Sequence, residues 1–183
     1  MDANWFIAFP MQMGHFHLRP APPARVRVFA ASDLHITLGF LGAVQESDAR
    51  KAWDQIENVA SFRRVQGSFS GVESLGHPRK PSALAAMVET GRDPLSEMIS
   101  EARAPLLRAA GAREDSRPPL PHMTLARIQR RASAAERREA LRWARSIDLR
   151  GVTFAADAVA LYTWAEDRQE RLFQIVERYD FDC

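Results

Sequence analysis

The sequence of 183 residues has one cysteine, few lysines and no long apolar run. Its single cysteine, Cys183, is the last residue, which excludes a disulfide framework and a cysteine metal cluster and favours a reducing, cytoplasmic location. No apolar stretch approaches the ~20 residues that span a bilayer. The first eleven residues lack the charged and apolar regions of a secretory signal. We therefore expect neither membrane insertion nor secretion.

Positive charge comes almost entirely from arginine, because Lys51 and Lys80 are the only lysines among the 25 Lys and Arg residues. A GC-rich genome is the simplest explanation of this bias. The formal net charge is only +2, which is not typical of a general nucleic-acid binder. Guanidinium groups are nevertheless the available phosphate ligands, and they suit bidentate contacts. The composition is that of an ordinary globular protein, and we expect residues 1–183 to form a single domain.

The hydrophobic pattern predicts an α+β fold with antiparallel sheets, because helices are too few for a doubly wound sheet. A capping box at Ser133 and Glu136 predicts the start of the last helix, and Pro105 predicts a kink or an early end in the helix before it. The proline-rich residues 11–23 predict a loop. Predicted strands cover residues 5–9, 25–30, 34–41, 62–72, 83–89, 120–128, 152–162 and 172–179, and predicted helices cover residues 47–59, 93–110 and 133–146.

Two nearly identical tetrapeptides, residues 35–38 (His-Ile-Thr-Leu) and 122–125 (His-Met-Thr-Leu), lie in predicted strands. Side chains alternate along a strand, so the histidine and threonine of each motif share the face opposite the apolar residues. A single motif of this kind fits a half-buried structural histidine. Two copies in the same context favour a shared function.

The residue types indicate acid–base chemistry on a phosphate. Imidazole titrates near neutral pH, so one neutral histidine can activate a nucleophile while a protonated one supplies the proton of the leaving group. We predict that His122 is the base and His35 the acid, and that the Thr37 and Thr124 hydroxyls bind phosphoryl oxygens. The sequence contains no convincing metal-ligand cluster. It therefore predicts a metal-independent phosphoesterase without a cofactor.

The two motifs resemble those of the 2H phosphoesterase superfamily. Residues 32–42 (Ser-Asp-Leu-His-Ile-Thr-Leu-Gly-Phe-Leu-Gly) are similar to the first motif of the bacterial 2′-5′ RNA ligase family, the RNA 2′,3′-cyclic phosphodiesterases. Residues 121–127 (Pro-His-Met-Thr-Leu-Ala-Arg) are similar to its second motif, and residues 76–81 to its Gly-x-Pro-Arg-x-Pro loop. The resemblance covers nearly the whole chain.

This resemblance implies a bilobal fold with two antiparallel sheets related by a pseudo-twofold axis, helices on the outside and a motif from each lobe at a central cleft. It implies hydrolysis of RNA 2′,3′-cyclic phosphate ends to 2′-phosphates, with reversible 2′-5′ RNA ligase activity. Arg127 stands where the family carries an arginine near the phosphate. Strict alternation places Arg127 on the apolar side of its strand, so it reaches the cleft only if the strand ends or bulges after Thr124.

The substrate stays open between an RNA end and a small nucleotide, such as a cyclic ADP-ribose phosphate or a 2′-5′ oligoadenylate. The loop at residues 11–23, where the family has a helix, and the alanine-rich strand at residues 82–88 both affect this choice. A non-catalytic nucleotide-binding module is a further alternative. Phe40, Tyr162 and Trp164 are candidates for base stacking, although each also fits a core or hairpin position. We expect a monomer that does not bind a membrane.

Overall fold

The computed structural model describes residues 3–13, 20–78 and 80–181, so part of the predicted loop at residues 11–23 lies outside the described residues. The strands in chain order are β1 (Trp5–Pro10), β2 (Gln12–Met13), β3 (Val26–Val28), β4 (His35–Gly42), β5 (Val65–His77), β6 (Lys80–Val88), β7 (His122–Ile128), β8 (Thr153–Ala156), β9 (Ala158–Trp164) and β10 (Phe173–Asp180). The helices are the 3₁₀ turn η1 (Ala31–Asp33), α1 (Glu46–Trp53), α2 (Ile56–Val59), α3 (Arg92–Ala109) and α4 (Ala134–Ser146).

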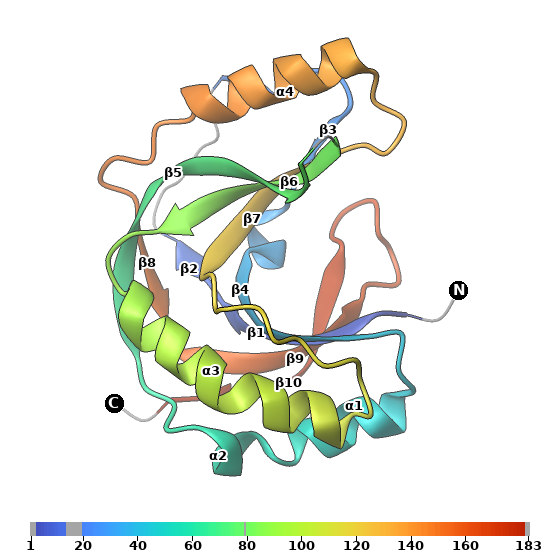
Figure 1. Cartoon of the computed structure of the whole chain (residues 1–183), viewed down its shortest axis with the longest axis vertical. Coiled ribbons are helices and arrows are strands. Elements are labelled where there is room, and N and C mark those ends of the chain that lie inside the picture. Colours follow the sequence, from blue (N-terminus) through green and yellow to red (C-terminus); the bar gives the residue numbers. More distant parts are fainter. Residues whose placement is uncertain (1–2, 14–19, 79, 182–183) are drawn as a thin grey trace.

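The α+β fold is confirmed, but the prediction of two separate sheets is wrong. The strands form one antiparallel sheet in the order β10-β9-β1-β4-β7-β6-β5-β8-β2, with β3 also paired to β7. Strands β4 and β7 join through one pair, Ile36 with Met123. The sheet curves so that a lower half (β10, β9, β1 and β4) faces an upper half (β7, β6, β5 and β3) (Figure 1). Two predicted lobes are therefore two halves of one bent sheet.

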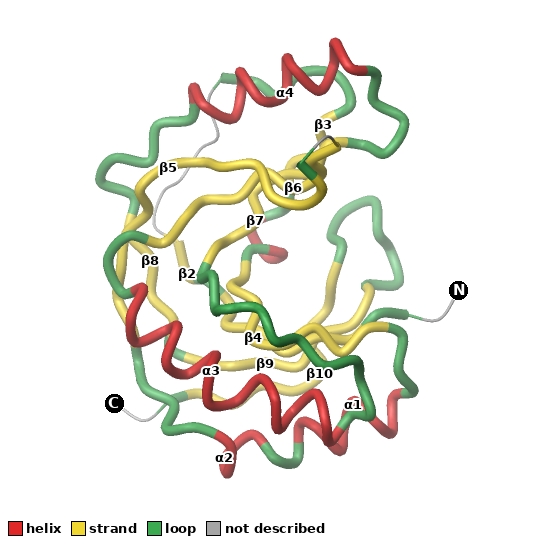
Figure 2. The backbone as a smooth tube through the Cα atoms, viewed as in Figure 1, coloured by secondary structure: helices red, strands yellow, loops and turns green. Residues whose placement is uncertain are grey.

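Helices α1 to α4 lie outside this bent sheet (Figure 2). Helices α1 to α3 cover the lower half, and α4 covers the upper half (Figure 1). Helix α3 packs on β4 through a buried stripe, because its apolar residues recur at helical spacing. This predicted stripe consists of Leu95, Met98, Ile99, Ala102 and Leu106. No helix in the described ranges is long and apolar enough to cross a membrane.

Several predicted helix boundaries differ from the structure. Helix α3 continues through Pro105, because the carbonyl of Glu101 that loses its hydrogen bond belongs to an exposed residue. The helix predicted over residues 47–59 is divided into α1 and α2. The predicted capping box is confirmed: Ser133 N–H donates to Glu136 Oε2 at 2.7 Å, and Glu136 N–H donates to Ser133 Oγ at 3.2 Å.

The predicted strand over residues 152–162 is two strands that belong to different parts of the sheet. β8 pairs with β5 and β2, whereas β9 pairs with β1 and β10. The chain leaves one part for the other at Asp157, between the two strands. The hairpin predicted at the end of the chain is confirmed as β9 and β10.

Candidate active site

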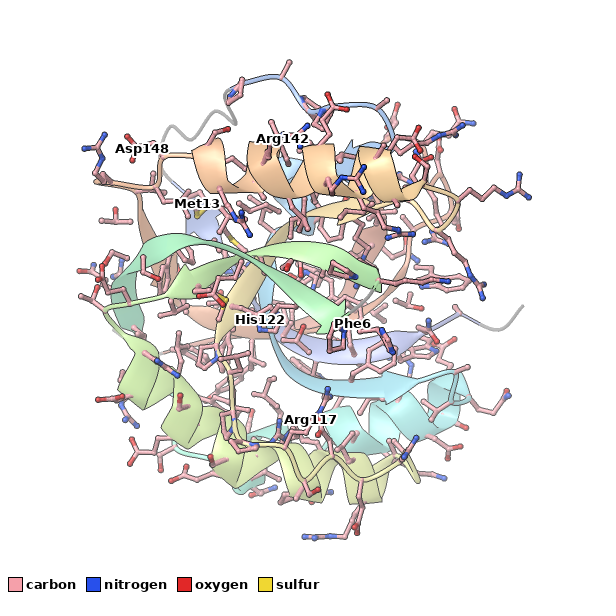
Figure 3. The ribbon with its side chains drawn as sticks, turned by 45° about the horizontal axis from the view of Figure 1, so that its top comes forward. Phe6, Met13, Arg117, His122, Arg142 and Asp148 are labelled. Atoms are coloured by element: carbon pink, nitrogen blue, oxygen red, sulfur yellow. The ribbon has the colours of Figure 1, made fainter. Side chains whose placement is uncertain are left out.

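Both His-x-Thr motifs line one cavity of about 580 Å³ between the two halves of the sheet. β4 supplies His35 and Thr37 from the lower half, and β7 supplies His122 and Thr124 from the upper half. The side chain of His122 lies between the upper strands and the lower helices (Figure 3). This volume suits a nucleotide-sized ligand. A second cavity of about 560 Å³, beside β2, β5 and β8, has no charged lining residue among those described.

Each motif strand contains a β-bulge directly after its threonine. In β4, Thr37 pairs with Ala8 and Gly39 pairs with Ile7, which leaves Leu38 as the extra residue. A bulge shifts the alternation of side chains by one residue, so Phe40 comes to the cavity face rather than Gly39.

The same shift occurs in β7. Thr124 pairs with Ala85 and Ala126 pairs with Leu84, which leaves Leu125 as the extra residue. Arg127 therefore lines the cavity. The sequence analysis required a bulge after Thr124 for Arg127 to reach the cleft, and β7 has that bulge. Phe40 and Arg127 occupy equivalent positions, three residues after the threonine of each motif.

Backbone carbonyls fix the orientation of both imidazoles. Nδ1 of His35 lies 2.7 Å from the Asp33 carbonyl oxygen, and Nδ1 of His122 lies 2.6 Å from the Leu120 carbonyl oxygen. A carbonyl oxygen can only accept a hydrogen bond, so Nδ1 of each ring must carry the proton and donate it. Each neutral ring therefore keeps an unprotonated Nε2, which can accept or deliver a proton at a ligand.

Burial keeps these imidazoles neutral in the unliganded protein. The His35 ring lies against the rings of Phe6, Tyr162 and Phe173, with centroid distances of 4.8, 5.5 and 5.5 Å. Desolvation there lowers the pKa of His35 to about 4. Desolvation also lowers the pKa of His122, and the positive charges of nearby arginines lower it further. A bound anion would favour the charged form of both rings.

Asp33 is a positioning residue that the sequence analysis did not identify. Its carboxylate is buried, with 1% of the residue exposed, and accepts hydrogen bonds from the N–H groups of Leu172 (2.8 and 3.0 Å) and Phe173 (3.1 Å). Its carbonyl accepts the bond from His35. Asp33 thus ties the first motif to the start of β10. Its partners lie 139 and 140 residues away in the chain, so no local pattern could have revealed them.

Two of the three candidates for base stacking line the cavity. Phe40 is 58% exposed there, and Trp164 also lines it, with the Arg168 guanidinium 4.3 Å from the centre of the Trp164 ring. The prediction for Tyr162 is wrong. Its residue is 1% exposed because its ring stacks on Phe6 at 4.9 Å within the core, so a ligand cannot reach it.

The cavity has a positive lining. Three arginines contribute to it, Arg27, Arg127 and Arg168, and no carboxylate does among the described residues. Arg27 was not among the predicted site residues, although it lies in the strand predicted over residues 25–30. No cluster of three or more His, Cys, Asp or Glu side chains that could hold a metal occurs in the described part of the chain. Arg142 lies on the outer helix α4, away from the cavity lining (Figure 3).

Known proteins resemble this chain in sequence and in fold. The family described as the 2′-5′ RNA ligase superfamily matches residues 15–168. The RNA 2′,3′-cyclic phosphodiesterase of Bacillus subtilis (strain 168) is 33% identical over 96 residues, which cover 52% of this chain and 51% of that protein. The matched part therefore spans about half the length of this curated relative.

Solved structures share the fold over almost the whole chain. E. coli LigT complexed with 3′-AMP has a TM-score of 0.68 at 18% identity, with 99% of each chain covered. The protein TT0787 of Thermus thermophilus has a TM-score of 0.68 at 16% identity, with 97% of each chain covered. LigT has also been crystallised with ATP and with NADP+. At these identities the likeness shows the α+β fold.

Proposed function

The chain belongs to the 2′-5′ RNA ligase superfamily, and on that premise we propose that it is a metal-independent cyclic phosphodiesterase that opens RNA 2′,3′-cyclic phosphate ends to 2′-phosphates. The observation that carries the proposal is a pair of imidazoles at one cavity, each locked through Nδ1 and each keeping Nε2 for proton transfer. The two halves act as a single domain, in a monomer.

The reaction needs one proton acceptor and one proton donor. Nε2 of one histidine takes a proton from water as the water oxygen attacks phosphorus. The bond from phosphorus to O3′ breaks, and Nε2–H of the other histidine protonates O3′, which leaves a 2′-phosphate and a free 3′-hydroxyl. The Thr37 and Thr124 hydroxyls donate to the non-bridging oxygens, and the positive charge of Arg127 stabilises the charge that develops on them. If an RNA 5′-hydroxyl replaces water, the same steps form a 2′-5′ linkage.

The direction of proton transfer depends on the bound phosphate. We propose His122 as the base and His35 as the acid, and a phosphate anion raises the pKa of both rings because it favours imidazolium. His35 needs the larger increase, since its pKa starts at about 4. A substrate with a p-nitrophenolate leaving group needs no acid. It should therefore restore turnover to His35→Ala and not to His122→Ala, and the reverse result would exchange the two roles.

Replacement of either histidine tests the proposal directly. Each proton-transfer group contributes about 10²–10⁴-fold, so His35→Ala and His122→Ala should lower turnover of a 2′,3′-cyclic mononucleotide by at least that order. His77→Ala is the matched control, because His77 lies at the end of β5 and does not line the cavity. A folded His35→Ala or His122→Ala protein with wild-type turnover would contradict the two-histidine mechanism.

The metal requirement has its own test. Turnover of the cyclic phosphate should be the same with and without EDTA, because the proposed steps use protein groups alone. If EDTA abolishes activity and Zn²⁺ or Mg²⁺ restores it, the reaction depends on a metal. The histidine variants described above would still test the role of the two imidazoles.

A small nucleotide is the second candidate substrate. The cavity volume suits a single nucleotide, and Phe40 and Trp164 offer aromatic faces for one base. A panel of cyclic mononucleotides, cyclic-ended RNA and cyclic ADP-ribose phosphate separates the two substrates by their kcat/KM values. Tight binding of a nucleotide without turnover of any member of the panel would favour the non-catalytic binding module.

A further inference from the structure

We propose that Arg27, beside Arg127, forms a second anion subsite that binds a phosphate on the 5′ oxygen of the substrate ribose. The inference rests on the proposed function, since it assumes that the cyclic phosphate lies at the two histidines. The subsite restricts the candidate substrates to nucleotides that carry a second phosphate. Such a phosphate belongs either to the internal phosphodiester of an RNA or to the 5′-phosphate or pyrophosphate of a small nucleotide.

The first argument is the pairing of two positive charges. Arg27 of β3 lies directly opposite Arg127 of β7 in the sheet, and both side chains line the cavity. Like charges in directly opposed positions destabilise a sheet. Neither arginine forms an ion pair with a carboxylate in the described part of the chain. An anionic ligand would compensate both charges.

The second argument is that Arg27 is held in place. Its Nη2 donates to the carbonyl oxygen of Arg168, in the loop between β9 and β10. Arg168 in turn packs over the Trp164 ring, so this end of the cavity is built from both halves of the sheet. A guanidinium has five N–H donors, and this contact uses one of its two Nη groups. The second N–H of Nη2 lies parallel to an N–H of either Nε or Nη1, so one edge of the guanidinium can still form a bidentate contact with a phosphate.

The third argument is position. Arg127 lies three residues beyond Thr124, or about 10 Å along an extended strand, and Arg27 lies about 5 Å further across, on the neighbouring strand. Arg127 can extend back toward the reacting phosphate at the histidines. Arg27 is the more distant of the two and suits a group on the other side of the ribose. The 5′ oxygen is the remaining ribose position that carries phosphate in a nucleotide with a 2′,3′-cyclic end.

Three substrates with the same reacting group separate the subsite from the catalytic centre. They are adenosine 2′,3′-cyclic phosphate, its 5′-phosphorylated form, and an adenosine dinucleotide with a 2′,3′-cyclic end. A charge-assisted contact between Arg27 and the second phosphate should raise wild-type kcat/KM by about 10- to 100-fold over adenosine 2′,3′-cyclic phosphate, mainly through a lower KM. The gain is expected for the 5′-phosphorylated form, for the dinucleotide, or for both. A gain for the dinucleotide alone assigns the subsite to RNA, and a gain for the 5′-phosphate alone assigns it to a small nucleotide.

Arg27→Gln should remove most of this preference, and Arg27→Lys, which keeps the charge, should retain part of it. Arg138→Gln removes one exposed positive charge from α4 and should leave the preference unchanged. Equal losses on all three substrates in Arg27→Gln would show that Arg27 binds the reacting phosphate, which would overturn the proposal. Absence of any preference in the wild type would also overturn it.

If none of the three substrates is hydrolysed, the proposed function is contradicted but the subsite is not. The subsite can then be tested by measuring ligand binding. Calorimetric titration would then compare adenosine 2′-phosphate with adenosine 2′,5′-bisphosphate. Tighter binding of the bisphosphate that disappears in Arg27→Gln supports the subsite. Equal affinities of the wild type for the two ligands overturn it.

Discussion

The enclosure of His35 predicts a loss of stability in mild acid. Three aromatic rings surround the imidazole, and its pKa in the folded protein is lowered to about 4. In the unfolded chain the pKa of histidine is about 6.5. Between these two values the unfolded state binds a proton that the folded state does not. The free energy of unfolding therefore falls as the pH falls from 6.5 to 4, and it is unaffected by His35 above that range.

The size of the effect follows from the difference in pKa. Each pH unit below 6.5 costs about 1.4 kcal/mol, so the loss is about 2 kcal/mol at pH 5 and up to about 3 kcal/mol near pH 4. Urea denaturation at pH 7, 6, 5 and 4.5 measures it in the wild type and in His35→Asn. The asparagine amide can still donate to the Asp33 carbonyl but does not titrate. The wild type should lose about 2 kcal/mol more than the variant between pH 7 and pH 5.

Other titrating groups are common to both proteins and cancel in this difference. Identical pH dependence in the wild type and His35→Asn would mean that His35 titrates alike in the folded and unfolded chains. The desolvation argument would then fail. Inorganic phosphate offers a further check, because an anion at the histidines should raise the pKa of His35 and reduce the dependence of stability on pH.

Three substitutions extend these tests to the walls of the cavity and to the core. Phe40→Ala should raise KM for nucleotide substrates by roughly 5- to 100-fold through lost stacking, with little change in the urea midpoint because the side chain is exposed; an unchanged KM would contradict base stacking there. Asp33→Asn should lower the free energy of unfolding by about 2–4 kcal/mol, because an amide nitrogen replaces an oxygen that accepts from Leu172 and Phe173; a loss below about 0.5 kcal/mol in urea denaturation would refute this role. Tyr162→Phe should leave Tm unchanged or raise it, because the buried hydroxyl has no hydrogen-bond partner among the described residues, and a fall in Tm of several degrees would show a missed partner.

The sequence carried enough information to predict the paired motifs, the strands that hold them and the class of the fold. Periodicity and capping are local properties, so the buried stripe of α3 and the capping box at Ser133 could be predicted from neighbouring residues. The joining of the two halves of the sheet could not be predicted in this way. Whether β4 and β7 belong to one sheet depends on the single pair of Ile36 with Met123, which packing decides and no local pattern marks.

The cavity lining was predicted only in part, for the same reason. Leu38 and Leu125 are unremarkable apolar residues in the sequence, yet as bulged residues they decide that Phe40 and Arg127 face the ligand. Alternation also cannot tell which of two aromatic residues in one strand is covered by a neighbouring strand. Tyr162 is covered by Phe6 across the β1–β9 pair, and this contact between distant segments was not visible in the sequence.

The single pair that joins β4 to β7 is also the point about which a rotation of the two halves of the sheet would be centred. Ile36 lies between the histidine and threonine of one motif, and Met123 between those of the other. When the two halves of the sheet rotate about this point, the displacement of each side chain is proportional to its distance from the point. Because Phe40 and Arg127 lie about 13 Å of strand from that point and the histidines about 3 Å, a rotation of about 10° displaces the former by about 2 Å and the latter by about 0.5 Å. Such a rotation would widen the mouth of the cavity and leave the spacing of the proton-transfer atoms nearly constant.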